Sequence, residues 1–199
     1  MNGSIVESPK NGNYTYEDYL SWDGDERYEL INGWAYLMAA ASPRHQEIVL
    51  NLLAAFWLFL KGKPCKVYQD IDVHLSPKPI TRKMLSLQRK KTVVRPDISV
   101  VCNPGQISDN GCDGAPTLVV EVHSPSTKRF DMKNKFEEYL MCGVKEYWMV
   151  EPRERTVQVC VLEKGNYILR AYDDADTLTS ALFPGLSIPL VDIFPNEQQ

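Results

Sequence analysis

Two strand-like stretches of this chain each carry one carboxylate where the pattern otherwise consists of apolar residues. Residues 93–101 and 117–122 are rich in valine, as buried strands commonly are, yet Asp97 lies in the first and Glu121 in the second. Asp and Glu are almost never fully buried without a partner, because desolvating a carboxylate costs several kcal/mol. The two positions therefore predict a shared site, and a divalent cation is the usual partner of such a pair.

The pattern of apolar and polar positions predicts helices and strands along the rest of the chain. Thr15 with Asp18, and Ser42 before Pro43, have the form of helix starts. The Asn32-Gly33 pair has the form of a hairpin turn. In chain order, the predicted elements are a helix over 15–20, hairpin strands over 27–31 and 34–38, a helix over 43–61, strands over 67–75, 93–101 and 117–122, a helix over 128–142, a strand over 145–151 and hairpin strands over 155–190, with a loop over 103–116.

This order of elements favours an α/β, or α+β, fold with a mixed sheet. The helix over 43–61 is apolar on every face, which predicts burial on most sides, across a sheet or against a partner subunit. The 199 residues fit one domain. We therefore expect a disordered tail over residues 1–13 and a single domain over residues 14–199.

Composition indicates the setting of the protein. The 44% of hydrophobic and 24% of charged residues are those of an ordinary soluble globular protein, and the net charge of -4 counts mildly against a nucleic-acid partner. The five cysteines include no C-x-x-C pair, which excludes a zinc ribbon or a thioredoxin motif. Their odd number and the lack of a secretory signal favour reduced, buried cysteines in a cytoplasmic protein, and the apolar run over 48–60 is too short to span a membrane.

The chemistry suggested by Asp97 and Glu121 is metal-dependent hydrolysis. Two carboxylates are enough to hold Mg²⁺, because this ion keeps several of its waters. Lys135 lies on the helix that follows, from which its amine can reach the strand ends and orient a water or neutralise developing charge. Glu29, with His45 or Gln46, is a candidate to complete the first or second shell from the hairpin and the long helix.

A basic segment precedes Asp97 and is a candidate phosphate contact. It contains Arg82, Lys83, Arg89, Lys90, Lys91 and Arg95, with no acidic residue among them. An excess of one charge over such a stretch is typical of a solvated loop, and it is equally compatible with an arm that binds phosphates.

Structural interpretations of the same residues stay open at this level. Glu121 can form a buried ion pair with Lys135 or Arg95, and Asp97 can cap a turn after Pro96. Lys135 can be a surface partner of Asp131, four positions earlier on the helix. The three histidines, His45, His74 and His123, have no spacing typical of a zinc enzyme and can serve as capping or core residues.

These motifs, taken together, resemble the PD-(D/E)XK, or restriction-endonuclease-like, superfamily, and more closely the Uma family of bacterial proteins within it. The resemblance extends over residues 14–195 and is carried by 28–33, His45, 95–101, 120–127, Asp131, Lys135, Tyr139, 143–148 and Pro152. It implies a central mixed β-sheet flanked by helices. It also implies that Asp97 and Glu121 bind the metal and that Glu29 supplies the acidic residue of the N-terminal element.

One departure from the superfamily pattern concerns its lysine. That lysine normally follows the glutamate by two residues, a position occupied here by His123, and Lys135 would replace it from the next helix. His123 would then join His45 and Gln46 in the second shell.

The function implied is a magnesium-dependent endonuclease acting on DNA, with Mn²⁺ as a substitute ion and a homodimer as a candidate assembly. The alternatives are a non-catalytic module that keeps the fold to bind nucleic acid or protein, and a hydrolase of smaller phosphate esters.

Overall fold

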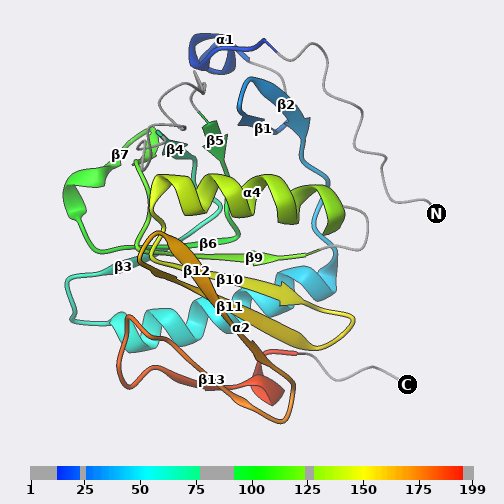
Figure 1. Cartoon of the computed structure of the whole chain (residues 1–199), viewed down its shortest axis with the longest axis vertical. Helices are drawn as coiled ribbons and strands as arrows, with labels where there is room; N and C mark the ends of the chain where they lie inside the picture. The colour runs from blue at the N-terminus through cyan, green and yellow to red at the C-terminus, as the bar shows by residue number, and fades with distance from the viewer. Residues whose placement is uncertain (1–12, 23–25, 77–91, 124–127, 195–199) are drawn as a thin grey trace.

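Two six-stranded sheets and two long helices form the body of the protein (Figure 1). The structure is a computed structural model that describes residues 13–22, 26–76, 92–123 and 128–194, of which residues 128–132 are described by their backbone alone. The helices are α1 (Tyr16–Leu20), α2 (Pro43–Leu60) and α4 (Lys128–Cys142), with 3-10 turns η1 (Pro104–Gln106) and η2 (Leu190–Asp192).

Both large sheets are mixed, which confirms the predicted fold class. The first sheet has the order β2 (Trp34–Leu37), β1 (Tyr28–Ile31), β5 (Thr92–Val94), β4 (Val73–Leu75), β8 (Gly111–Asp113) and β7 (Ile107–Ser108). The second sheet has the order β12 (Asn166–Tyr172), β11 (Thr156–Glu163), β10 (Glu146–Glu151), β9 (Leu118–Val122), β6 (Ile98–Val101) and β3 (Lys66–Gln69). A separate pair joins β13 (Thr177–Thr179) to β14 (Ser187–Pro189). The parallel pairs are β4 with β8 and β9 with β10.

The predicted helix signals act as expected. The Thr15 hydroxyl accepts a hydrogen bond from the backbone N–H of Asp18, whose carboxylate accepts the Thr15 N–H in return, so α1 begins with a capping box. The Ser42 hydroxyl caps α2 by accepting the N–H of His45. Helix α4 ends at Cys142 and is followed by Gly143, whose φ of 83° is in the left-handed region that glycine adopts most easily.

The second sheet lies between the two long helices (Figure 1). On one face, α2 packs Ile48, Leu52 and Phe56 into a core that includes Val120 and Trp148. On the other face, α4 joins a second core that takes residues from both sheets, such as Val94 of β5 and Tyr147 of β10. Helix α4 therefore fills the corner where the two sheets meet, and this corner positions the candidate site.

Two predicted strands are each divided between the two sheets, which corrects the sequence interpretation. Residues 67–75 form β3 in the second sheet and β4 in the first, because Asp70 between them turns the chain with a φ of 50°. Residues 93–101 likewise form β5 and β6, and Pro96 and Asp97 lie in the link. Pro96 has no N–H to donate to a sheet, so continuous pairing ends there. In residues 67–75 the alternation of apolar and polar positions continues through the break and hides it.

Smaller differences concern the predicted loop and the C-terminal region. Residues 103–116, predicted as a loop, contain η1, β7 and β8. The hairpin of β11 and β12 is confirmed, with its turn at Lys164-Gly165. The turn at Asp173-Asp174 leads out of this hairpin, since β13 pairs with β14 and not with β12.

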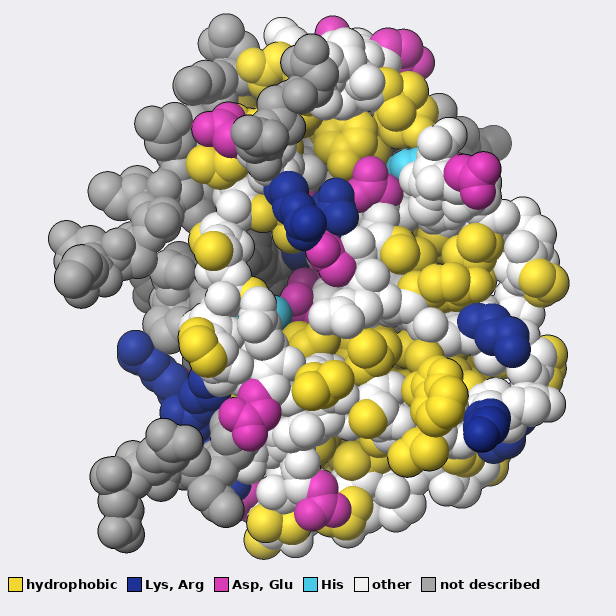
Figure 2. Space-filling view, turned by 180° about the vertical axis from the view of Figure 1, so that it is seen from behind, with side chains coloured by type: hydrophobic (Ala, Val, Ile, Leu, Met, Phe, Trp, Pro, Cys, Tyr) yellow, Lys and Arg dark blue, Asp and Glu magenta, His cyan; other side chains and the backbone are white. Residues whose placement is uncertain are grey.

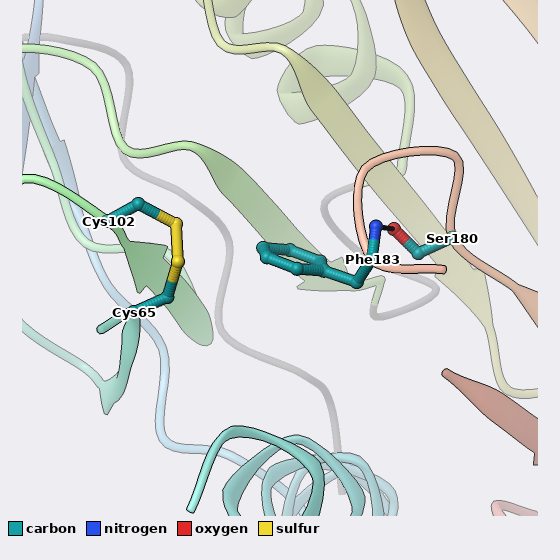
Figure 3. Close-up of a disulfide and its surroundings, with 4 residues drawn as sticks. All are labelled: Cys65, Cys102, Ser180 and Phe183. Atoms are coloured by element: carbon teal, nitrogen blue, oxygen red, sulfur yellow. Dashed lines mark hydrogen bonds between the residues drawn. A yellow bond between two sulfur atoms is a disulfide. The ribbon is translucent and has the colours of Figure 1, made fainter. Parts of the chain in front are cut away.

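Two cysteines form a disulfide, so the prediction of five reduced cysteines is wrong for this pair. Cys65 precedes β3 and Cys102 follows β6, and the pairing of Lys66 with Val101 brings their Cα atoms to 3.9 Å. Figure 3 shows the disulfide with the ring of Phe183 pointing toward it. The other three, Cys112, Cys142 and Cys160, are free and buried as predicted. The spacing of the cysteines in the sequence cannot reveal the register in which β3 pairs with β6.

Two further expectations meet the structure only in part. The predicted tail lies outside the described residues except for Asn13. Within the described part of the chain, no helix has the length and apolar character needed to cross a membrane.

Candidate active site

The two carboxylates that the sequence singles out lie opposite each other, Asp97 directly before β6 and Glu121 on the adjacent strand β9. Ile98 of β6 pairs with Val120 of β9 in antiparallel register, which places Asp97 and Glu121 across from each other at the ends of these strands. Asp97 Oδ2 accepts a hydrogen bond of 2.7 Å from the backbone N–H of Val122. This bond ties Asp97 to the strand that carries Glu121, so the site does not depend on a flexible link.

Lys135 reaches this point from α4 and contacts two glutamates. Its Nζ lies 2.9 Å from Glu29 Oε1 and 3.0 Å from Glu121 Oε1. The backbone N–H of Arg95 donates a further bond of 2.8 Å to Glu29 Oε1. Glu29 comes from the first sheet and Glu121 from the second, so the lysine links the two sheets. Lys135 is only 5% exposed, which excludes the interpretation of a surface partner for Asp131.

Tyr139, one of the residues that carry the family resemblance, also contacts Glu121, although no site role was predicted for it. Its hydroxyl donates a hydrogen bond of 2.6 Å to Glu121 Oε1, the same oxygen that Lys135 contacts. Lys135 and Tyr139 are four positions apart on α4 and therefore lie on one face of the helix. That spacing is the sequence signal from which a shared role could have been found.

The predicted second-shell residues have different surroundings. His45 Nε2, near the start of α2, lies 3.2 Å from Asp97 Oδ1. Gln46 is exposed, and its side chain makes no hydrogen bond with the described residues. His123 is buried, and its Nδ1 lies 2.8 Å from Glu151 Oε1. Of the three, the structure thus brings His45 alone into contact with a predicted metal ligand.

The predicted basic arm is described only at its end. Residues 77–91, which include Arg82, Lys83, Arg89, Lys90 and Lys91, lie outside the described residues. Arg95 Nη1 lies 3.1 Å from Asp72 Oδ1, and its Nε lies 3.2 Å from Asp70 Oδ1. Burial lowers the pKa of Arg95, but these two aspartates outweigh burial and raise it. Figure 2 shows charged and histidine side chains gathered beside a hollow in one face of the molecule.

Burial is the largest influence on the acid–base equilibrium of Glu121. Burial raises its pKa to about 8 against the opposing effect of Lys135, while the charges of Asp97 and Glu29 raise it and the Tyr139 bond lowers it. Burial lowers the pKa of His45, but contact with Asp97 outweighs burial and raises it. Asp97 keeps 22% of its side chain exposed, so the site contains one carboxylate open to solvent and one buried.

The raised pKa of Glu121 predicts how stability depends on pH in metal-free protein. A native pKa near 8 means that the folded protein keeps a proton that the unfolded chain releases above its ordinary pKa of 4.5. Stability should therefore fall by about 1 kcal/mol per pH unit between pH 6 and pH 8. Urea unfolding with a chelator present measures this slope. Glu121→Gln, which cannot ionise, should flatten it, and equal slopes in the two proteins would contradict the assignment.

The carboxylate oxygens of Asp97 and Glu121 fit a magnesium ion with few protein ligands better than a structural zinc ion with four. Across the described parts of the chain, no three His, Cys, Asp or Glu residues gather in a way that could hold an ion. Two facing carboxylates suit Mg²⁺, which binds through one or two carboxylates and retains waters, whereas structural zinc takes four protein ligands. Glu121 Oε1 is occupied by Lys135 and Tyr139, while Oε2 makes no hydrogen bond with the described residues.

The fold and the site define a restriction-endonuclease-like protein, with a mixed sheet that presents two carboxylates and a neighbouring helix that supplies a lysine. A sequence profile of the Uma2 family, described as "Putative restriction endonuclease", matches residues 16–191. The chain belongs to this family.

Two individual proteins are similar to this chain. A crystal structure from Anabaena variabilis ATCC 29413, described as a "putative nuclease" belonging to DUF820, superposes with a TM-score of 0.72 at 18% identity, and the match covers 91% of this chain and 97% of that one. The uncharacterized protein slr1290 of Synechocystis sp. PCC 6803 is 27% identical over 169 residues, which are 81% of this chain and 82% of that protein. The first likeness supports the fold, and the second extends over most of both sequences.

Proposed function

We propose that this protein is an endonuclease that uses Mg²⁺, or Mn²⁺ in its place, to hydrolyse phosphodiester bonds of DNA. The observation that carries the proposal is the approach of Asp97 to Glu121, with Lys135 buried against Glu121. The family description and the likeness to a nuclease structure point to the same class of reaction.

Each side chain has a separate task in this proposal. Asp97 and Glu121 hold the cation, which supplies Lewis acidity toward a phosphate oxygen and makes a water ligand more acidic. Lys135 keeps Glu121 oriented and offers positive charge where negative charge develops. Glu29 anchors the ammonium from the opposite sheet, and His45 orients Asp97 through Oδ1. The basic residues from Arg82 to Lys91 remain candidates for contact with DNA phosphates.

Binding and cleavage should be measured together on the wild-type protein. Calorimetry with Mn²⁺ and Mg²⁺ is expected to show binding, and plasmid and linear duplex DNA are expected to be cut only when one of these ions is present. RNA of matched length distinguishes the two nucleic acids. A protein that binds neither ion and cuts neither DNA nor RNA would overturn the proposal.

One observation favours a second function, that of a non-catalytic binding module. The ammonium of Lys135 already neutralises part of the charge of Glu29 and Glu121, which is also the arrangement of a purely structural buried ion pair. Such a module would retain DNA without cutting it, and its affinity would fall steeply as salt rises. A module that binds protein would show no such dependence on salt.

The homodimer remains a prediction, and the surface that supports it is the exposed side of α2. An interface formed by the aromatic pair Tyr147 and Trp148, a further sequence-based argument for a homodimer, is wrong, because both side chains are fully buried. The outward side of α2, in contrast, exposes Leu50, Trp57 and Leu58 at 62%, 54% and 66%. Exposed apolar residues grouped on one helix are typical of protein interfaces, and a second copy is the partner that we propose for them.

A further inference from the structure

The Tyr139 hydroxyl and the Lys135 ammonium converge on one oxygen of Glu121. The two donors lie 2.6 and 3.0 Å from Oε1, and Oε2 makes no hydrogen bond with the described residues. Two donors on the same oxygen fix the rotation of the carboxylate, because turning the group would break both bonds. Oε2, which makes no hydrogen bond with the described residues, is therefore held pointing in one direction.

The hydroxyl of Tyr139 has no role in packing that would account for its position. The side chain is completely buried, and its ring packs edge-on against Tyr147 with centroids 4.9 Å apart. A phenylalanine would supply the same ring contact without the penalty of burying a hydroxyl. The hydroxyl lies 2.6 Å from a carboxylate oxygen, which in its ionised form only accepts, so the hydroxyl is the donor.

Lys135 by itself restrains Glu121 less well. Its ammonium is shared with Glu29 Oε1, 2.9 Å away on the other sheet, so only part of its hydrogen-bonding capacity is directed at Glu121. The Tyr139 hydroxyl has Glu121 as its hydrogen-bond acceptor, and its ring is enclosed in the core. Of the two donors, the tyrosine is the more rigid, because a ring has fewer rotatable bonds than a lysine side chain.

We infer that Tyr139 is a positioning residue of the metal centre, which holds Oε1 of Glu121 so that Oε2 faces the divalent cation. The inference rests on the proposed function, since it requires Glu121 to be a ligand. Partners that orient a metal ligand commonly change metal affinity by about 10–100-fold when they are removed.

The test compares Tyr139→Phe with Tyr167→Phe. Tyr167 is a matched control, because it is also buried in the same core and its hydroxyl donates a bond of 2.9 Å to the backbone oxygen of Val144, away from the carboxylates. Each variant loses one buried hydrogen bond and keeps its ring. Calorimetric Mn²⁺ titration of wild type should give a dissociation constant that rises about tenfold or more in Tyr139→Phe and stays unchanged in Tyr167→Phe.

A second measurement separates positioning from simple loss of packing. Thermal unfolding should report similar losses in the two variants, while DNA cleavage by Tyr139→Phe should recover when Mn²⁺ is raised to saturation. Equal Mn²⁺ affinity in the two variants, in a protein whose wild type binds Mn²⁺, would overturn the role of Tyr139 and leave the proposed function intact. A wild type that binds neither Mn²⁺ nor Mg²⁺ and cuts neither DNA nor RNA would refute both the role of Tyr139 and the proposed function, and this result is obtained before any variant is made.

Discussion

Asp97→Asn is expected to abolish metal binding and to lower metal-dependent cleavage by about a thousandfold. A site built on two carboxylates loses half of its charge in this variant, and a neutral amide is a weak ligand for Mg²⁺. The amide oxygen still has the shape to accept the 2.7 Å bond from the N–H of Val122, so the link between β5 and β6 should be preserved. Calorimetry with Mn²⁺ and plasmid cleavage measure the two effects.

Asp113→Asn is the matched control for this variant. Asp113 also contacts a histidine, with Oδ1 at 2.9 Å from His74 Nδ1, but it is 69% exposed and belongs to β8 of the first sheet. Its amide variant should bind Mn²⁺ and cut DNA as wild type does. If Asp97→Asn cut DNA at the same rate as Asp113→Asn, Asp97 would not be a metal ligand and the site would have to be placed elsewhere.

Lys135→Met is expected to lower the free energy of unfolding by about 3–5 kcal/mol, the usual loss when one partner of a buried ion pair is removed. The substitution keeps the length of the side chain but leaves Glu29 and Glu121, which are 5% and 7% exposed, without their shared cation. Urea unfolding measures the loss. Lys133→Met is the control, since Lys133 is exposed on the same helix and should change stability by no more than about 0.5 kcal/mol.

The loss in Lys135→Met should grow above about pH 8. Glu121 of the wild type has released its proton there, whereas without the ammonium the pKa of Glu121 rises further, so the folded variant still retains a proton that the unfolded chain releases and continues to lose stability. Adding Glu29→Gln and Glu121→Gln to the variant removes the buried acids and should restore most of the stability. A Lys135→Met protein as stable as Lys133→Met would show that the lysine is not the counter-ion of the two glutamates.

Local sequence signals were sufficient for the elements that carry the site. Capping residues at Thr15 and Ser42, the Asn32-Gly33 turn and Gly143 after α4 act through neighbouring backbone, so their effect is encoded within a few residues. The approach of Asp97 to Glu121 was also predictable, because a buried carboxylate requires a partner wherever it occurs. The same reasoning could not choose between Lys135 and Arg95 as that partner.

The sequence by itself determined the fold class and most of the residues of the candidate site. It singled out Asp97 and Glu121 because each is a carboxylate within a Val-rich stretch, 93–101 or 117–122. Only the tertiary structure decided that Asp97 lies in the link between two sheets, that Cys65 meets Cys102, and that Lys135 is buried between Glu29 and Glu121. It also revealed the Tyr139 hydroxyl on Glu121 Oε1. The physical reason is that periodicity reports which side of an element is apolar, whereas register and the meeting of two sheets depend on contacts between residues far apart in the chain.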